Sequence, residues 1–251
     1  MEIFSKIDSD RFGIKVGKVT EEFFHDKQIE DEIKYFIENE FDVIFVRISL
    51  QEIDTINALE KRGFKLMDVQ STLNYPLKGK TKVDLPERNK IFNIREMRDG
   101  DINTLVDIAV TSFNNYGHYF ADKRLNLKSS LDTYGDWTYN SCVNKNVADK
   151  VFVAEIDDEI LGFLSFKTFN SREGTYAAGG LGAVNPKHRS IGVFQNISIF
   201  GLEWGVEMGF DWEEHNVLVN NYPVNKSFLN IGFRPNKSMV TLHGWIDEIT
   251  I

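Results

Sequence analysis

Cysteine is nearly absent from this chain of 251 residues, which contains only Cys142. A single thiol cannot form a disulfide within the chain, so a disulfide-stabilised scaffold is excluded and a reducing, cytoplasmic environment is expected. Long apolar runs are absent too, since no stretch approaches the roughly 20 residues that a membrane-spanning helix needs. The first six residues lack a basic stretch followed by an apolar one, so we expect no secretory signal.

Basic residues are outnumbered, with 29 Lys plus Arg against 38 Asp plus Glu and a formal net charge of −9. A field of this sign repels nucleic acid and anionic membranes, because both are bound by neutralising phosphates. We therefore expect neither as a partner. The five histidines are scattered and none pairs with another at ligand spacing, so no metal site is expected either. A ligand that carries phosphate would have to be held locally, by backbone amides and a few placed cations.

The composition, 42% hydrophobic and 27% charged, is that of a globular protein with a substantial core. Residues 76–90 contain two prolines, a glycine and several basic residues but few apolar ones, which is typical of an exposed linker. This segment divides the chain into an N-terminal domain, residues 1–85, and a C-terminal domain, residues 86–251.

Strand and helix signals alternate in the C-terminal domain. The predicted strands are 91–95, 151–155, 160–166, 175–184, 216–219 and 238–245, and the predicted helices are 102–110, 131–144, 191–208 and 224–230. Residues 211–214 are interpreted as a solvated turn. This order predicts an α/β protein with a mixed sheet covered by helices.

Residues 58–75 resemble residues 227–245, because each segment has a helical pattern, then Gly-Phe, then a strand. We therefore interpret the N-terminal domain as a truncated copy of the second half of the C-terminal domain. The alternative is two unrelated helix–strand units, since many helices end in glycine.

The most informative stretch is the turn between the predicted strand 175–184 and the predicted helix 191–208. Arg189 and Gly192 lie where this helix begins, and there the unpaired amides and the positive end of the helix dipole face outward. Gly192 permits close approach of the backbone to a ligand, and Arg189 adds a cation. The pattern indicates a site for a pyrophosphate.

At this point the sequence resembles the GNAT superfamily of acyl-CoA N-acyltransferases. Their signature, Arg/Gln-x-x-Gly-x-Gly/Ala, is matched by residues 189–194 except at Phe194. The second half of their pattern follows in residues 221–233, and Gly162 matches the third strand of the family. The resemblance covers residues 91–245 and implies a GNAT fold, with a truncated GNAT-like domain in front. Among these proteins, the chain resembles bacterial dTDP-fucosamine acetyltransferases and related nucleotide-amino-sugar N-acyltransferases.

The resemblance implies acyl-CoA as co-substrate, with its pantetheine arm along residues 181–184 and its diphosphate on the turn after them. An amide near Leu181 or Gly182 would polarise the thioester carbonyl, and we assign this oxyanion role to Gly182. The implied CoA-binding residues are Leu181, Gly182, Ala183, Val184, Arg189, Ser190, Ile191, Gly192, Val193, Phe194, Asn221 and Phe228.

The sequence departs from the family at Phe228, which stands where a tyrosine usually donates a proton to the leaving sulfur. Tyr222 is one substitute, a water is another, and unassisted departure is a third, because a thiol has a pKa of about 8.5. His118 is the candidate base for the acceptor amine, on pKa grounds. His215 is interpreted as structural and Cys142 as a buried thiol rather than a nucleophile.

His118 lies in an aromatic loop between the first two helices, where the resemblance implies that the acceptor is held, and Tyr116, Tyr119 and Trp137 are candidates to stack on a thymine-like base. The alternative is that these rings pack a lid. The resemblance implies acyl transfer to the amine of a dTDP-linked amino-dideoxyhexose, for surface polysaccharide synthesis. Two other readings stay open: transfer to another small amine (a polyamine, an antibiotic or a peptide N-terminus) and a non-catalytic CoA-binding module. Homodimerisation is also left open.

Overall fold

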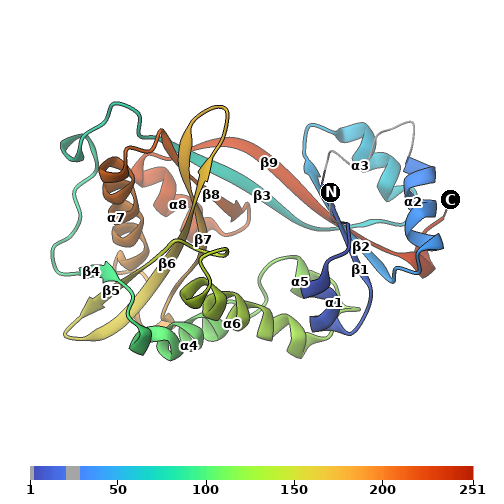
Figure 1. Cartoon of the computed structure of the whole chain (residues 1–251), viewed down its shortest axis with the longest axis horizontal. Helices are drawn as coiled ribbons and strands as arrows, with labels where there is room; N and C mark the ends of the chain where they lie inside the picture. The colour runs from blue at the N-terminus through green and yellow to red at the C-terminus, as the bar shows by residue number, and fades with distance from the viewer. Residues whose placement is uncertain (1–2, 21–28, 251) are drawn as a thin grey trace. The chain divides into compact units, whose positions relative to one another are not determined.

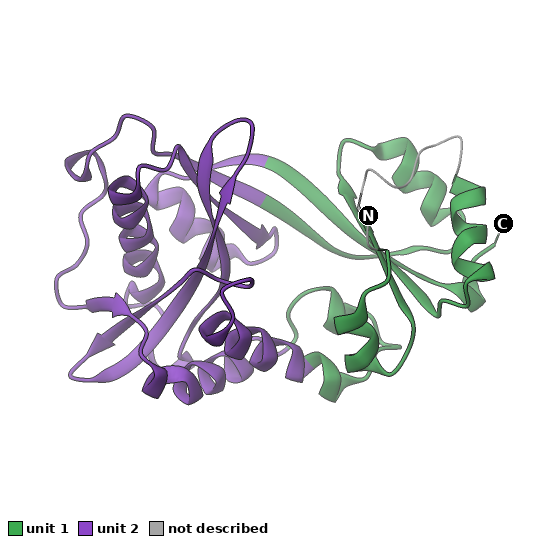
Figure 2. Ribbon diagram, viewed as in Figure 1, with its two compact units in different colours: residues 1–71, 115–130, 237–251 green, residues 72–114, 131–236 purple. Residues whose placement is uncertain are grey.

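The computed structural model describes residues 3–20 and 29–250 (Figure 1). The chain forms two compact units (Figure 2). Unit 1 comprises residues 1–71, 115–130 and 237–251, and unit 2 comprises residues 72–114 and 131–236. Strands β3 (Lys65–Pro76) and β9 (Arg234–Trp245) each run from one unit into the other. These units are not continuous in the sequence and do not divide the chain at residue 85. The predicted division into domains 1–85 and 86–251 stays a prediction.

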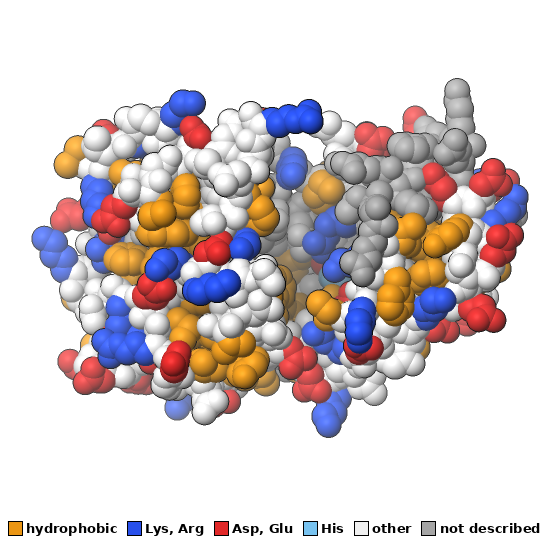
Figure 3. Space-filling view, in the orientation of Figure 1, with side chains coloured by type: hydrophobic (Ala, Val, Ile, Leu, Met, Phe, Trp, Pro, Cys, Tyr) orange, Lys and Arg blue, Asp and Glu red, His pale blue; other side chains and the backbone are white. Residues whose placement is uncertain are grey.

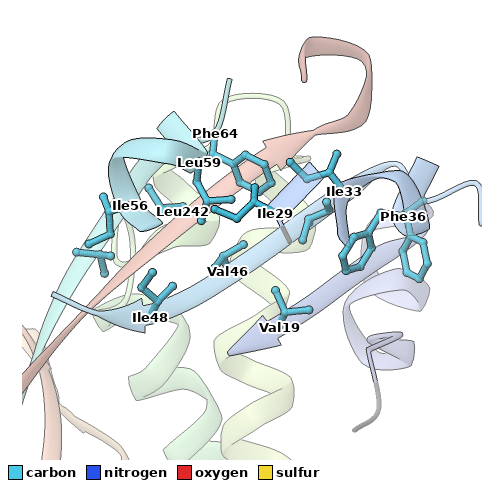
Figure 4. Packing of buried hydrophobic residues seen from close by; sticks show 13 residues of the cluster. Val19, Ile29, Ile33, Phe36, Val46, Ile48, Ile56, Leu59, Phe64 and Leu242 are labelled. Atoms are coloured by element: carbon cyan, nitrogen blue, oxygen red, sulfur yellow. The ribbon is translucent and has the colours of Figure 1, made fainter. Parts of the chain in front are cut away.

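Unit 1 is built on β1 (Val16–Thr20) and β2 (Val43–Ser49), which are parallel, and on the end of β9, which is antiparallel to β2. Alternate residues of β2 face opposite sides of the sheet. Ile44, Val46 and Ile48 lie on one side and pack against α2 (Ile29–Glu38) and α3 (Ile53–Glu60) in one core cluster (Figure 4). Phe45 contributes to a second cluster with residues of α1 (Lys6–Phe12) and α5 (His118–Ala121). Unit 1 therefore has a covered sheet with two cores.

Unit 2 is built on an antiparallel run of strands to which β8 (Trp212–Leu218) is added in parallel with β7 (Thr175–Val184). The antiparallel strands are β4 (Asn93–Glu96), β5 (Lys150–Ile156), β6 (Glu159–Asn170) and β7. The helices with residues in this unit are α4 (Ile102–Ser112), α6 (Leu127–Val143), α7 (Val193–Met208) and α8 (Tyr222–Ile231). Short 3₁₀ turns are η1 (Lys82–Asp84), η2 (Asp99–Asp101) and η3 (Pro186–His188), with η4 (Ile246–Glu248) in unit 1.

Helix α7 packs on the sheet of unit 2 through Ile197 and Trp204, and the Trp204 ring contacts those of Phe152 and Phe166. The predicted strands and helices are present, with ends shifted by a few residues except at β8. There the prediction of a solvated turn at 211–214 is wrong, because the strand begins at Trp212 and Glu213 is fully buried. The acidic run has low strand propensity, and tertiary packing overrides it.

The prediction that residues 76–90 form an exposed linker is also wrong in part, since the segment is tied to α7. Leu77 is buried and packs beside Gly205 of that helix. The Arg88 guanidinium bonds Glu203 with a 2.8 Å Nε–Oε1 distance, and the Asn89 amide donates to Asn196 Oδ1 at 2.6 Å. Two of the basic residues that indicated a solvated segment, Lys82 and Arg88, pair with acidic residues of the helix, Glu207 and Glu203.

The predicted helix–Gly–Phe–strand repeat is present in the structure. Gly63 and Gly232 follow α3 and α8 with φ of 98° and 115°, a conformation that favours glycine, and each precedes a buried phenylalanine. The order of the strands is β1-β2-β9-β3-β8-β7-β6-β5-β4. The strands of the two repeats, β3 and β9, are therefore neighbours in the sheet, with β2 on the other side of β9 and β8 on the other side of β3. A common origin of the two repeats as GNAT-like domains stays a prediction.

Acidic and basic side chains are interspersed on the face that Figure 3 shows. Ion pairs among the described residues include Arg124 with Asp247 and Lys150 with Glu96. Among the helices of the described residues, none combines the length and the apolar character that crossing a membrane requires.

Candidate functional site

Strands β7 and β8 stop pairing partway along their length. Their ladder runs from Tyr176 with Trp212 to Gly179 with His215. Beyond that pair β7 continues to Val184 and β8 to Leu218, with no ladder pair between them in the described chain. The predicted parting of these strands is confirmed, and beyond Gly179 it leaves β7 unpaired with β8 beside the turn that leads into α7. At the end of this stretch the Val184 carbonyl accepts from Ser112 Oγ at 3.1 Å.

A β-bulge in β7 accompanies this parting. Phe166 of β6 pairs with Gly179, whereas Leu164 pairs with Gly182, so β7 has one extra residue between the two pairs. Ser165 holds the bulge: its buried hydroxyl accepts from the Leu181 amide at 2.9 Å and donates to the Leu181 carbonyl at 3.1 Å. The Leu181 amide is therefore engaged within the protein, which favours Gly182 over Leu181 as the oxyanion donor.

The turn between β7 and α7 leaves the first amides of the helix open. The backbone of Ser190 has φ 69° and that of Gly192 has φ 92°, so two residues in the left-handed region turn the chain sharply. Gly192 is the N-cap of α7 and provides no side-chain cap. The first-turn amides of a helix have no acceptor within the helix and carry its positive dipole end. They are available to an anion.

Arg189 lies on this turn with an exposed side chain, and it forms no ion pair or hydrogen bond with another described residue. Ile191 beside it is half exposed. The two residues that the motif singled out, Arg189 and Gly192, are thus placed together on the surface at the helix N-terminus. A guanidinium next to open amides can hold a diphosphate.

Phe228 of α8 is buried between α7 and β8. Its ring centroid lies 5.2 Å from that of Phe194, 4.9 Å from that of Phe233 and 4.3 Å from that of His215. Tyr222, in contrast, is 75% exposed in the first turn of α8. The two positions are six residues apart, or about 9 Å along the helix axis. Tyr222 and Phe228 are therefore at different ends of the helix, with Asn221 as its N-cap.

The sequence interpretation missed a buried pair on β8. Glu213 Oε1 lies 2.8 Å from His215 Nε2, and both side chains are almost completely buried. Burial raises the pKa of Glu213, although the hydrogen bond with His215 opposes this shift. Spacing of two residues on a strand places both side chains on one face, and this was the signal available in the sequence.

Cys142 is half buried, and burial raises the pKa of its thiol to about 11. The thiol is therefore protonated at neutral pH and is a poor nucleophile, as expected. Among the residues that the structure describes, no group of three His, Cys, Asp or Glu side chains is placed to hold a metal ion.

His118 lies in unit 1 and belongs to a buried chain of hydrogen bonds. Its Nδ1 is 2.9 Å from His243 Nε2, and His243 Nδ1 is 2.8 Å from Asp122 Oδ2, which also accepts from the Trp245 indole. Burial lowers the pKa of His118 well below its usual value, and the neighbouring charges of His243, Arg47 and Lys18 lower it further. His118 is therefore neutral at pH 7. Its role as a base stays a prediction.

The other predicted acceptor residues are spread over both units. Tyr119 is in unit 1, where its hydroxyl donates to Asp8 Oδ1 at 2.8 Å, and Tyr116 is half buried in the same unit. Trp137 lies on α6 in unit 2 and is 41% exposed. Their part in binding an acceptor remains a prediction.

Acidification is expected to destabilise unit 1. Burial lowers the folded-state pKa of both His118 and His243. At any pH between the lowered pKa of the folded state and the unfolded-state pKa of about 6.5, the unfolded chain therefore binds more protons than the folded one. Stability is thus full above about pH 6.5 and falls below it, by up to about 1.4 kcal/mol per pH unit for each histidine. Hydrogen exchange of the β2 and β9 amides from pH 7.5 to pH 5 measures this.

His118→Gln should flatten that dependence, because glutamine does not titrate. His188→Gln is the matched control, since His188 is in unit 2, where it is partly exposed beside Glu159. An unchanged slope in the His118 variant would contradict the assignment of the acid sensitivity to this chain of hydrogen bonds.

No family model matches the chain, and no curated protein matches it. Several solved structures have the same fold. A GCN5-related N-acetyltransferase from Kribbella flavida aligns with a TM-score of 0.60 at 11% identity, over 91% of this chain and 80% of that one. A tandem GNAT protein from the clavulanic acid biosynthesis pathway aligns with a TM-score of 0.59 at 12% identity, over 86% and 68%. A functionally unknown conserved protein from Staphylococcus epidermidis aligns with a TM-score of 0.59 at 12% identity, over 94% and 85%.

These identities are low, so the comparisons establish the fold rather than the substrate. The fold class expected from residues 91–245 is confirmed. The chain adopts the mixed α/β fold of the GCN5-related N-acetyltransferases.

Proposed function

We propose that this protein transfers an acyl group from acyl-CoA to a primary amine. The observation that carries the proposal is the combination of parted strands β7 and β8 with the open N-terminus of α7 and the exposed Arg189. An extended amide chain can bind along unpaired strand backbone as an added strand. A diphosphate at its end meets the helix amides and the guanidinium. Acyl-CoA combines these two chemical groups, and proteins of this fold include N-acetyltransferases.

In this proposal the pantetheine arm lies along residues 181–184, and the diphosphate is held by residues 189–194. Asn221 and Phe228 complete the CoA site from α8. The Gly182 amide faces the thioester carbonyl and stabilises the oxyanion that forms as the amine attacks, a contribution of about 3 kcal/mol to the barrier. Holding both substrates in one complex supplies much of the remaining acceleration.

We further propose an amino-dideoxyhexose linked to dTDP as the acceptor, with Tyr116, His118, Tyr119 and Trp137 as the residues that bind it. The support is the resemblance of the sequence to nucleotide-amino-sugar N-acyltransferases. His118 as base and Tyr222 as acid remain the predictions made from the sequence. Transfer to another small amine, or CoA binding without transfer, are the rival functions.

A thiol-release assay separates these functions. Acetyl-CoA is incubated with dTDP-linked amino sugars, with polyamines and with peptides that have free N-termini, and free CoA thiol is measured. Release with the amino sugars supports the proposal. Release only with another amine would replace the acceptor, and acetyl-CoA binding without release from any acceptor would favour the non-catalytic reading.

Phe228→Tyr is expected to change the rate of thiol release by no more than about threefold, or about 0.7 kcal/mol of barrier. The reason is that a CoA thiol, with a pKa of about 8.5, leaves readily as the thiolate, so a phenol at this position adds little. Thermal unfolding controls for altered packing of the buried ring. A gain of tenfold or more would show that the protein lacks an acid that the tyrosine restores.

A further inference from the structure

His215 lies at the last ladder pair before β7 and β8 part. Its ring covers Gly179 so closely that a Cβ atom on Gly179 would be 1.9 Å from His215 Nδ1. Only a residue without a side chain permits this contact. The imidazole, which is 4% exposed, is thereby packed against β7 at the last paired position before the two strands part.

Glu213 fixes the orientation of this ring. The Glu213 carboxylate lies 2.8 Å from Nε2; in its ionised form it can only accept, so the neutral ring then carries its hydrogen on Nε2 and the lone pair on Nδ1. Nδ1 makes no hydrogen bond to any other described residue. The second carboxylate oxygen, Oε2, is buried and unpaired within the described chain. A core residue with an orphaned oxygen is costly, by about 1–3 kcal/mol, so packing alone gives no reason for an acid here.

The aromatic rings that contact His215 cannot carry a proton. The ring contacts described around it are those of Phe166 at 5.8 Å, Phe228 at 4.3 Å and Phe233 at 5.3 Å between ring centroids. Phenylalanine rings have no ionisable group. Within this cluster of side chains, the Glu213–His215 pair is therefore the part that can transfer a proton. An imidazole oriented by a carboxylate is well suited to that task.

We propose that His215 carries the proton of acyl transfer, an inference that rests on the proposed function. The amine nitrogen attacks the thioester carbon, a C–N bond forms, and the proton lost by nitrogen moves to Nδ1. The C–S bond then breaks with its electron pair on sulfur, and Nδ1 returns the proton to give the free thiol. One proton thus passes from amine to thiol with no outside acid or base. Glu213 is a positioning residue that holds Nε2.

Affinity labelling tests this without knowledge of the acceptor. Bromoacetyl-CoA places an alkylating carbon next to the thioester carbonyl, and a Cys142→Ser background removes the only thiol. We expect one label per chain on the peptide that contains His215, found by mass spectrometry and blocked by excess acetyl-CoA. His215→Gln should reduce labelling by more than about 50-fold, and Glu213→Gln should slow it about tenfold and shift its pH profile, since the ring is no longer oriented.

Calorimetry with acetyl-CoA separates failure of this inference from failure of the proposed function. If acetyl-CoA binds but the label falls on His118, on another residue or nowhere, His215 does not face the acyl group and the inference is overturned while the function stands. If acetyl-CoA does not bind to the folded protein, both fail. Circular dichroism of the His215 and Glu213 variants confirms that each is folded before its labelling is compared.

Discussion

An Arg189→Ala, Gly192→Glu double variant is expected to bind acetyl-CoA at least about 100-fold more weakly than the parent, a loss of about 3 kcal/mol. Removing the guanidinium deletes a charge-assisted contact with the diphosphate, which is worth about 1.5–3 kcal/mol. The glutamate then places a negative charge at the mouth of α7, where the phosphate oxygens would lie. Gly192 has φ 92°, so the new side chain also strains the turn. Isothermal titration calorimetry at low salt measures the change.

Arg172→Ala is the matched control for net charge. Arg172 is exposed in the turn between β6 and β7, at the opposite end of β7 from the motif, about 30 Å away along the ten-residue strand. We expect this variant to bind acetyl-CoA within about twofold of the parent, because screening weakens so distant a charge. If the folded double variant binds as tightly as the Arg172 variant, the phosphate site is elsewhere and the proposed function loses its support.

Phe228→Ala is expected to lower the free energy of unfolding by about 3–5 kcal/mol, as large-to-small changes of a buried aromatic residue do. The ring is 1% exposed and lies between the rings of Phe194, Phe233 and His215, so its loss leaves a cavity at the junction of α7, α8 and β8. Chemical denaturation followed by tryptophan fluorescence gives the value.

Leu229→Ala is the comparison, since the next residue on α8 is 44% exposed. It should cost no more than about 0.5 kcal/mol, the usual range for surface positions. Equal effects of the two substitutions would mean that Phe228 is not packed as described. Its contact with His215 would then offer no basis for the proton path proposed above.

The features that the sequence predicted well are those set by neighbours in the chain. Gly192 at the start of α7 and Gly232 at the end of α8 act through local backbone conformation. The apolar periodicity of α7 depends on residues within a few turns. Such signals are contained in a short window, so the strand–turn–helix motif, the helix–Gly–Phe–strand repeat and the GNAT-like order of elements were readable from the residues.

The missed features are of two kinds. Some are contacts between residues that are distant in the sequence, and others are residues whose burial depends on how the strands and helices pack. His118 and His243 are 125 positions apart, and no local pattern indicates that they share a hydrogen bond. Glu213 looked like part of an acidic turn, because charge normally indicates solvent. Only the packing of β8 against α7 reveals that this carboxylate is buried beside His215.

The sequence by itself determined the fold class and the place of the strand–turn–helix motif at residues 184–193, since both follow from periodicity, glycine positions and spacing over tens of residues. The tertiary structure alone decided that β9 lies beside β2 and β3 beside β8, that β7 bulges opposite Ser165, and that His215 stands where β7 and β8 part. The physical reason is that hydrogen-bond ladders and burial join residues far apart along the chain, and their energies depend on partners that no local window contains.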